Sequence, residues 1–174
     1  MQVTIFVDAS FCLDTRVCAF GYYIACDRGR KQGGRNLNVR PNFPYEAETL
    51  AIANALYQAI KYNLVYKHDH VTIRTDCNRS ILAYQDQIKN LSWNEERAIN
   101  YFRKVCEEND LTYNLEHIKA HSGTGTPEKY AHDKCDKYAK VYMNKAREQY
   151  TKDSHERFRK KNKTHAGRRR KRGY

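Results

Sequence analysis

The chain lacks long hydrophobic runs, and no stretch approaches the roughly 20 apolar residues that a membrane-spanning helix needs. Its first residues, 1–5, also lack the basic segment and the apolar run of a secretory signal. We therefore expect a soluble, non-secreted protein with no membrane partner, located in the cytoplasm, or in the nucleus if the host is a eukaryote.

Cysteine pairs of the CxxC type are also missing. None of the six cysteines is grouped with histidines in the way that a zinc site requires. Hydrophobic residues make up 40% of the chain, which is enough for a core without disulfides. We expect reduced cysteines that serve as small core or surface residues.

Positive charge is abundant but unevenly distributed. The net charge is +12, and residues 151–174 hold 11 Lys/Arg and 2 Asp/Glu, so residues 1–150 carry only +3. A polycation attracts phosphate backbones without reading sequence, because it releases condensed counterions. We predict one compact domain at 1–147 and a basic tail at 148–174, flexible or helical, that binds nucleic acid. The alternatives for the tail are a solvated segment or a localisation signal.

Hydrophobic periodicity predicts three strands followed by alternating helices and strands. The expected strands are 2–8, 17–26, 35–40, 70–75 and 111–118; the expected helices are 45–62, 78–89, 94–109 and 128–147; and 27–34 is a polar turn. This order predicts an α/β fold with a mixed five-stranded sheet, three strands in an antiparallel meander and two parallel, flanked by helices. Gly21, inside the second strand, predicts a bulge or a close backbone approach.

Four acidic residues are placed where they can meet. Asp8 and Asp76 end the first and fourth predicted strands, Glu48 lies early in the first helix, and Asp136 lies on the last helix. Sites in open sheets form beyond the carboxyl ends of adjacent strands. Clustered carboxylates need cations to stay ionised, and hard oxygen ligands suit Mg²⁺ or Mn²⁺. Each acid alone is equally well explained as a turn, capping or solvated residue, so the four must be considered together.

Four segments carry a resemblance to a known family. They are Phe-Val-Asp-Ala-Ser at 6–10, the helical segment 48–56, Ile-Arg-Thr-Asp-Cys-Asn at 73–78, and His-Ser-Gly at 121–123 followed by Cys-Asp-Lys-Tyr-Ala at 135–139. With these motifs in this order, residues 2–143 resemble type 1 ribonuclease H. The resemblance implies a ribonuclease H-like fold and an endonuclease that hydrolyses the RNA strand of RNA–DNA hybrids, leaving 5′-phosphate and 3′-hydroxyl ends.

The resemblance also implies roles for individual residues. Two Mg²⁺ ions, or Mn²⁺ as the alternative, would be held by Asp8, Glu48, Asp76 and Asp136. His121, on a glycine-flanked loop, would move protons or help product release near neutral pH. The substrate-binding positions would be Ser10, Asn78 and Asn42, of which Asn78 matches the position that contacts the minor groove, where the 2′-hydroxyl distinguishes RNA from DNA. We expect a monomer.

The sequence departs from the family pattern in several places. The loop before Asp136 is longer than usual, so Asp133 competes with it as the fourth ligand. Glu46 competes with Glu48 in the same way. Pro44-Tyr45 replace an asparagine pair that often precedes the helical glutamate, and Asn42 is the candidate to take its place.

The interval between Asp76 and His121 is too short for the basic protrusion that some members use to hold substrate. We therefore expect the C-terminal tail to supply this contact.

Two other functions fit the same residues. The first is a DNA-cutting nuclease of the same fold, of the junction-resolving kind; the second is a catalytically silent nucleic-acid-binding protein. Such a silent protein should lack one of the carboxylates, whereas all four are present here.

Overall fold

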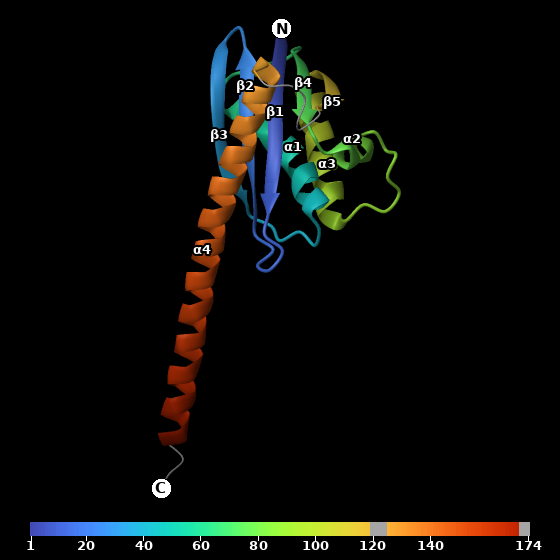
Figure 1. Cartoon of the computed structure of the whole chain (residues 1–174). Coiled ribbons are helices and arrows are strands. Elements are labelled where there is room, and N and C mark those ends of the chain that lie inside the picture. The colour runs from blue at the N-terminus through green and yellow to red at the C-terminus, as the bar shows by residue number, and fades with distance from the viewer. Residues whose placement is uncertain (119–124, 171–174) are drawn as a thin grey trace.

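A computed structural model describes residues 1–118 and 125–170, with side chains as far as residue 157. The elements are β1 (Gln2–Phe11), β2 (Cys18–Cys26), β3 (Gly29–Leu37), α1 (Pro44–Lys61), β4 (His70–Thr75), α2 (Asn78–Tyr84), α3 (Trp93–Glu108), β5 (Thr112–His117) and α4 (Pro127–Arg170). Figure 1 shows this arrangement. No helix of the described part combines the length and the apolar character that a membrane crossing requires.

The five strands form one mixed sheet in the order β3-β2-β1-β4-β5. β1 pairs antiparallel with β2, which pairs antiparallel with β3, whereas β4 is parallel to both β1 and β5. The predicted fold class is therefore confirmed.

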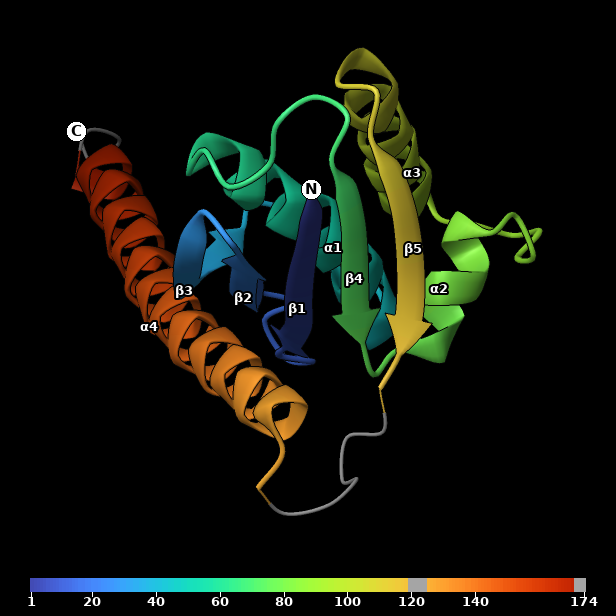
Figure 2. The same ribbon diagram turned by 90° about the horizontal axis from the view of Figure 1, so that it is seen from above.

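Helices cover both faces of the sheet (Figure 2). On one face, α1 presents a row of fully buried alanines, Ala47, Ala51, Ala55 and Ala59, so that its backbone approaches the strands closely. On the other face, α4 packs across β1, β2 and β3. The two layers leave the carboxyl ends of β1 and β4 beside each other at one edge.

The third strand differs from the prediction. It spans Gly29–Leu37, so the segment 27–34, expected as a polar turn, is mostly strand. The reason is that β3 lies at the edge of the sheet, where polar residues such as Arg30 and Lys31 project into solvent and hide the hydrophobic alternation.

Two element ends also differ. β1 continues to Phe11, so Asp8 lies within the strand and not at its end. α2 ends at Tyr84, because the chain turns at Asp86, which has a positive φ of 61°.

Helix α4 is longer than the sequence predicts. It runs to Arg170, and the expected boundary between 147 and 148 lies inside it. Beyond 147 the chain is rich in Lys and Arg, which favour helix without offering a buried apolar stripe, so periodicity did not reveal this part. The helix leaves the rest of the molecule past the carboxyl end of β1 (Figure 1), and the Arg40 guanidinium lies over the Tyr150 ring at 4.3 Å from its centroid.

Gly21 makes the predicted close backbone approach. A Cβ atom there would lie 1.9 Å from the main-chain oxygen of Cys135 on α4. The β1–β2 register runs without interruption through Asp8 and Gly21, so there is no bulge. Cys135 also donates from Sγ to the main-chain oxygen of Phe6 at 3.2 Å. These contacts hold the first turns of α4 against β1 beside Asp8.

Candidate metal centre

Three side chains from distant segments converge at the edge where β1 and β4 run side by side. Phe6 pairs with Arg74 in the parallel register, which brings Asp8 and Asp76 to the same height two residues later. His132 reaches them from α4. One ligand atom from each of Asp8, Asp76 and His132 lies within 4.8 Å of the other two.

Glu48 belongs to the same cluster, which it enters from α1. Its Oε2 is buried and has no hydrogen-bond partner among the described residues. Burial, and then the charges of Asp8 and Asp76, raise the pKa of Glu48 well above its usual value. A buried carboxylate oxygen without a partner is costly, so this atom lacks the cation or donor that would satisfy it.

The competing Glu46 faces a different part of the molecule. It is buried, but its Oε1 accepts from the main-chain N–H of Asn42 at 3.1 Å and its Oε2 from Asn94 Nδ2 at 3.3 Å. Glu46 thus links the start of α1 to α3, and its carboxylate is already occupied by hydrogen bonds.

The remaining charges show that the cluster carries excess negative charge. Burial, and then the charge of Asp76, raise the pKa of Asp8 to about 7. His132 Nε2 lies 3.5 Å from Asp76 Oδ2; this contact lowers the pKa of Asp76 and raises that of His132. Carboxylates this close cannot all ionise without added positive charge, so the donor set fits a divalent cation.

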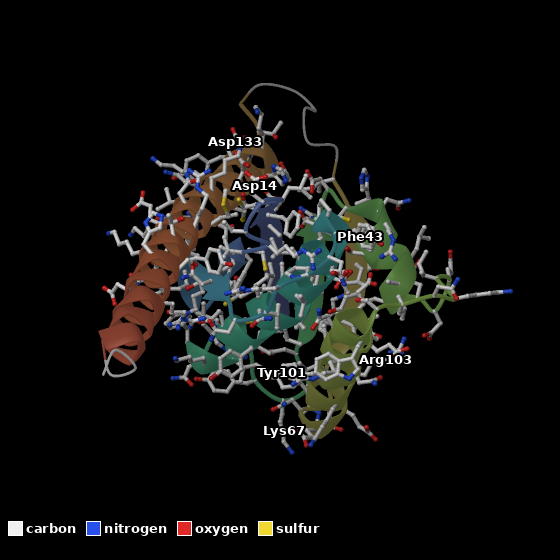
Figure 3. The ribbon with its side chains drawn as sticks, turned by 90° about the horizontal axis from the view of Figure 1, so that it is seen from below. Asp14, Phe43, Lys67, Tyr101, Arg103 and Asp133 are labelled. Carbon is white, nitrogen blue, oxygen red and sulfur yellow. The ribbon has the colours of Figure 1, made fainter. Side chains whose placement is uncertain are left out.

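Asp136 lies near the cluster and Asp133 does not. The charge of Asp136 adds to the rise in the pKa of Asp8, although its side chain is 41% exposed and lies 2.7 Å from Lys140 Nζ. Asp133 is 59% exposed and pairs with Lys129 Nζ at 3.3 Å. Figure 3 labels it on α4, at the edge of the molecule. Of the two, Asp136 faces the cluster. Its carboxylate would have to leave the ion pair with Lys140 in order to bind a metal ion.

The predicted substrate-binding residues surround the same edge of the sheet. Ser10 is half-buried on β1, on the same face as Asp8, and Asn78 is the exposed first residue of α2. Asn42 is exposed, and its Oδ1 accepts from Arg16 Nη1 at 3.0 Å, which joins the loop after β1 to the segment before α1. His121 lies outside the described residues.

Sequence reasoning missed two histidines. His132 precedes Asp136 by four residues, a spacing that puts both on one face of a helix, and this spacing is the one signal that could have indicated it. His117, at the end of β5, has its Nε2 3.0 Å from the main-chain oxygen of Asp76. Its position follows from the pairing of β4 with β5, which the local sequence does not reveal.

Solved structures with the same architecture are ribonucleases H. The chain matches ribonuclease H1 of the halophilic archaeon Halobacterium salinarum with a TM-score of 0.65 and 16% identity, over 83% of this chain and 99% of that one. It matches the N-terminal ribonuclease H domain of a Mycobacterium tuberculosis protein with a TM-score of 0.60 and 12% identity, over 85% and 97%. A third match is LC11-RNase H1, isolated from compost by a metagenomic approach and solved in complex with an RNA/DNA hybrid. Its TM-score is 0.58 and its sequence identity 15%, and the match covers 83% of this chain and 98% of that one.

No curated protein matches the sequence. The family model described as RNase H, however, matches residues 1–144, which is most of the chain and includes β1 to β5 and the first turns of α4. The matched segment contains Asp8, Glu48, Asp76 and His132. This chain therefore belongs to the ribonuclease H family.

Proposed function

We propose that this protein is a metal-dependent endonuclease that hydrolyses the RNA strand of RNA–DNA hybrids. The observation that carries the proposal is the convergence of Asp8, Glu48 and Asp76, whose mutual repulsion calls for cations, in a ribonuclease H fold. The substrate class is supported by the relative LC11-RNase H1, which was solved with an RNA/DNA hybrid.

The proposed metal ligands are Asp8, Glu48, Asp76 and Asp136, with Mg²⁺ as the ion and Mn²⁺ as the alternative. Two such ions, when bound, would supply positive charge for the attacking and leaving oxygens of a phosphodiester hydrolysis. The expected products are a 5′-phosphate and a 3′-hydroxyl. Oε2 of Glu48, which has no partner within residues 1–118 and 125–157, and the raised pKa of Asp8 fit this role, because both groups gain a partner when a cation enters.

The chain's own residues supply positioning and proton movement. Asp8, whose pKa is raised to about 7 by its burial and then by the charge of Asp76, would release its proton when a cation binds. His121 is proposed to move a proton or assist product release. Ser10, Asn78 and Asn42 are proposed to contact the hybrid, with Asn42 oriented by Arg16.

The distal part of α4 is the proposed second contact with nucleic acid. Residues 151–174 carry a net charge of +9, and the helix extends past the edge of the sheet where the cluster lies (Figure 1). This contact would be with phosphates and would not read sequence. We propose that the enzyme acts as a monomer.

A cleavage assay with matched duplexes and Mg²⁺ tests the function. We expect the RNA–DNA hybrid to be cut, and RNA–RNA and DNA–DNA duplexes of the same sequence to stay intact. Asp76→Asn should lower the rate on the order of a hundredfold or more, because metal-assisted charge stabilisation contributes several kcal/mol.

Asp133→Asn and Asp136→Asn form a matched pair on one helix. Asp136→Asn should reduce cleavage as Asp76→Asn does, whereas Asp133→Asn should change the rate less than about threefold, since exposed ion pairs contribute under about 1 kcal/mol. Cutting of DNA–DNA duplexes instead would indicate a junction-resolving type of nuclease. Hybrid binding without cleavage at any metal concentration would indicate a silent binding protein.

A further inference from the structure

We propose that His132 is a direct metal ligand through Nε2, so that one of the two cation positions has a mixed nitrogen and oxygen donor set. The inference rests on the proposed function only in that Asp8 and Asp76 hold the same ion. It predicts a metal preference shifted from Mg²⁺ toward first-row transition-metal ions such as Mn²⁺.

The burial of His132 is the first argument. The residue is 7% exposed, and its Nε2 is buried without a hydrogen-bond partner among the described residues. Buried ring nitrogens are normally hydrogen-bonded, because leaving one without a partner is unfavourable. A histidine held only for packing would not point this nitrogen at two carboxylates.

The distances are the second argument. Nε2 lies 3.5 Å from Asp76 Oδ2, longer than the roughly 2.7–3.2 Å of a good N–H···O hydrogen bond. Two ligands that share one ion at about 2.1–2.2 Å each lie roughly 3.0–3.5 Å apart when their angle is near 90–110°. The donors of Asp8, Asp76 and His132 lie within 4.8 Å of one another, so an ion between them would draw the donors inward by at most roughly 1–1.5 Å.

The position of His132 on α4 is the third argument. Cys135, three residues further on, is the residue whose backbone contacts Gly21 and whose thiol donates to Phe6. His132 therefore projects from the part of α4 that contacts β1 and β2 directly, on the side that faces Asp8. A ligand on such an element is pre-positioned, unlike one on a loop.

The donor chemistry gives the consequence for metal choice. Mg²⁺ is a hard cation that takes oxygen ligands and keeps several waters, whereas imidazole nitrogen binds transition-metal ions more readily. Replacing one oxygen by an imidazole nitrogen thus favours Mn²⁺ over Mg²⁺ relative to an all-carboxylate site. The other near histidine, His117, approaches the main-chain oxygen of Asp76 and offers no free nitrogen on that side.

Pulsed electron paramagnetic resonance of the full chain with Mn²⁺, without substrate, tests the proposal directly. A coordinated imidazole gives a ¹⁴N coupling to the Mn²⁺ spin. We expect this coupling in the wild type and in His117→Ala, the matched control, and its loss in His132→Ala. Calorimetric titration should show Mn²⁺ affinity reduced by roughly 10–100-fold in His132→Ala, with a smaller loss for Mg²⁺.

A second measurement protects the test against misfolding of His132→Ala. Chains labelled with ¹⁵N-histidine and carrying both His117→Ala and His121→Ala should still show a ¹⁵N coupling. Absence of nitrogen coupling in the wild type with Mn²⁺ bound, or its persistence in a folded His132→Ala, would overturn the proposal. Hybrid cleavage without nitrogen coupling rejects only the ligand, whereas nitrogen coupling without hybrid cleavage rejects only the nuclease.

Discussion

Gly21 is the residue that sets how near α4 comes to the cluster. Its missing side chain leaves room for the main-chain oxygen of Cys135, which a Cβ atom would approach to 1.9 Å. The obstacle is backbone on both sides, in a helix and in a central strand, so neither can yield without moving the element. The spacing between the sheet and α4, and with it the location of His132, depends on this one position.

Replacing Gly21 by alanine should therefore destabilise the protein by about 3 kcal/mol, as overpacking against backbone does. It should also weaken divalent metal binding, because α4 is displaced. The matched control is Gly33→Ala, where the new Cβ would meet the Tyr22 hydroxyl at 2.9 Å, which is a side-chain atom and not backbone. Urea unfolding measures the free energy of unfolding of both variants. Equal, small losses of stability in the two variants would contradict the role assigned to Gly21.

The sequence pointed to some members of the cluster and not to others. Asp8, Glu48 and Asp76 each stand beside a local motif, and the structure places all three together. His132 has no such motif. Its burial and its aim at Asp76 arise from the packing of α4 on β1, which depends on residues more than a hundred positions away.

At the scale of elements, prediction succeeded where an element has one buried face. The strands 70–75 and 17–26 and the helix 45–62 were located to within about one residue, because their apolar residues follow the period of the structure. It failed for β3, an edge strand with exposed polar residues, and for the distal half of α4, which has no apolar stripe, it left a flexible and a helical tail as alternatives. In both segments most of the described side chains are exposed, so the sequence there carries no clear hydrophobic period.

The basic extension of α4 gives a prediction at this scale. Deleting residues 151–174 should raise the KM for hybrid at physiological salt and leave kcat unchanged, since it removes phosphate contacts far from the reacting bond. The plot of log affinity against log salt should flatten by about 0.9 for each lost phosphate contact. Kinetics at several salt concentrations measure this.

A matched variant separates charge from length. Replacing the Lys and Arg residues of 157–172 by glutamine keeps the helical propensity and removes the charge. It should behave like the deletion. An unchanged salt slope in both variants would reject the tail as a nucleic-acid contact.

For the molecule as a whole, the cluster connects folding with metal and with pH. The pKa of Asp8 is raised from its ordinary 3.8 to about 7, and those of Glu48 and His132 are also raised. Each group then binds protons more tightly when folded than when unfolded. Without divalent metal, stability is therefore highest below their unfolded pKa values and falls as pH rises toward and beyond 7. Asp76, with a lowered pKa, acts in the opposite direction, but only in more acidic solution.

We expect the melting temperature in EDTA to be lower at pH 8 than at pH 5.5 by about 5–10 °C. One pKa unit is worth about 1.4 kcal/mol, and each kcal/mol shifts the melting temperature of a chain this size by roughly 2–4 °C. Added Mg²⁺ or Mn²⁺ should remove most of the difference, because the cation replaces the proton. Scanning calorimetry at both pH values, with and without metal, measures it.

Asp8→Asn supplies the control for this experiment. Its uncharged amide removes the central repulsion, so the variant should be more stable than the wild type in EDTA at pH 8 and should respond little to metal. A wild type whose melting temperature rises with pH in EDTA would contradict the raised pKa values of Asp8, Glu48 and His132.

The length of α4 has a geometric consequence for the substrate. At about 1.5 Å per residue, the stretch from Asp136 to Arg157 spans roughly 30 Å, and that to Arg170 roughly 50 Å. At about 3.4 Å per base pair these distances correspond to roughly 9 and 15 base pairs. If the proposed function holds, we expect the positive end of α4 to meet phosphates of the duplex only when that duplex continues about one full turn beyond the cleavage point. Shorter duplexes would be held by the catalytic end alone.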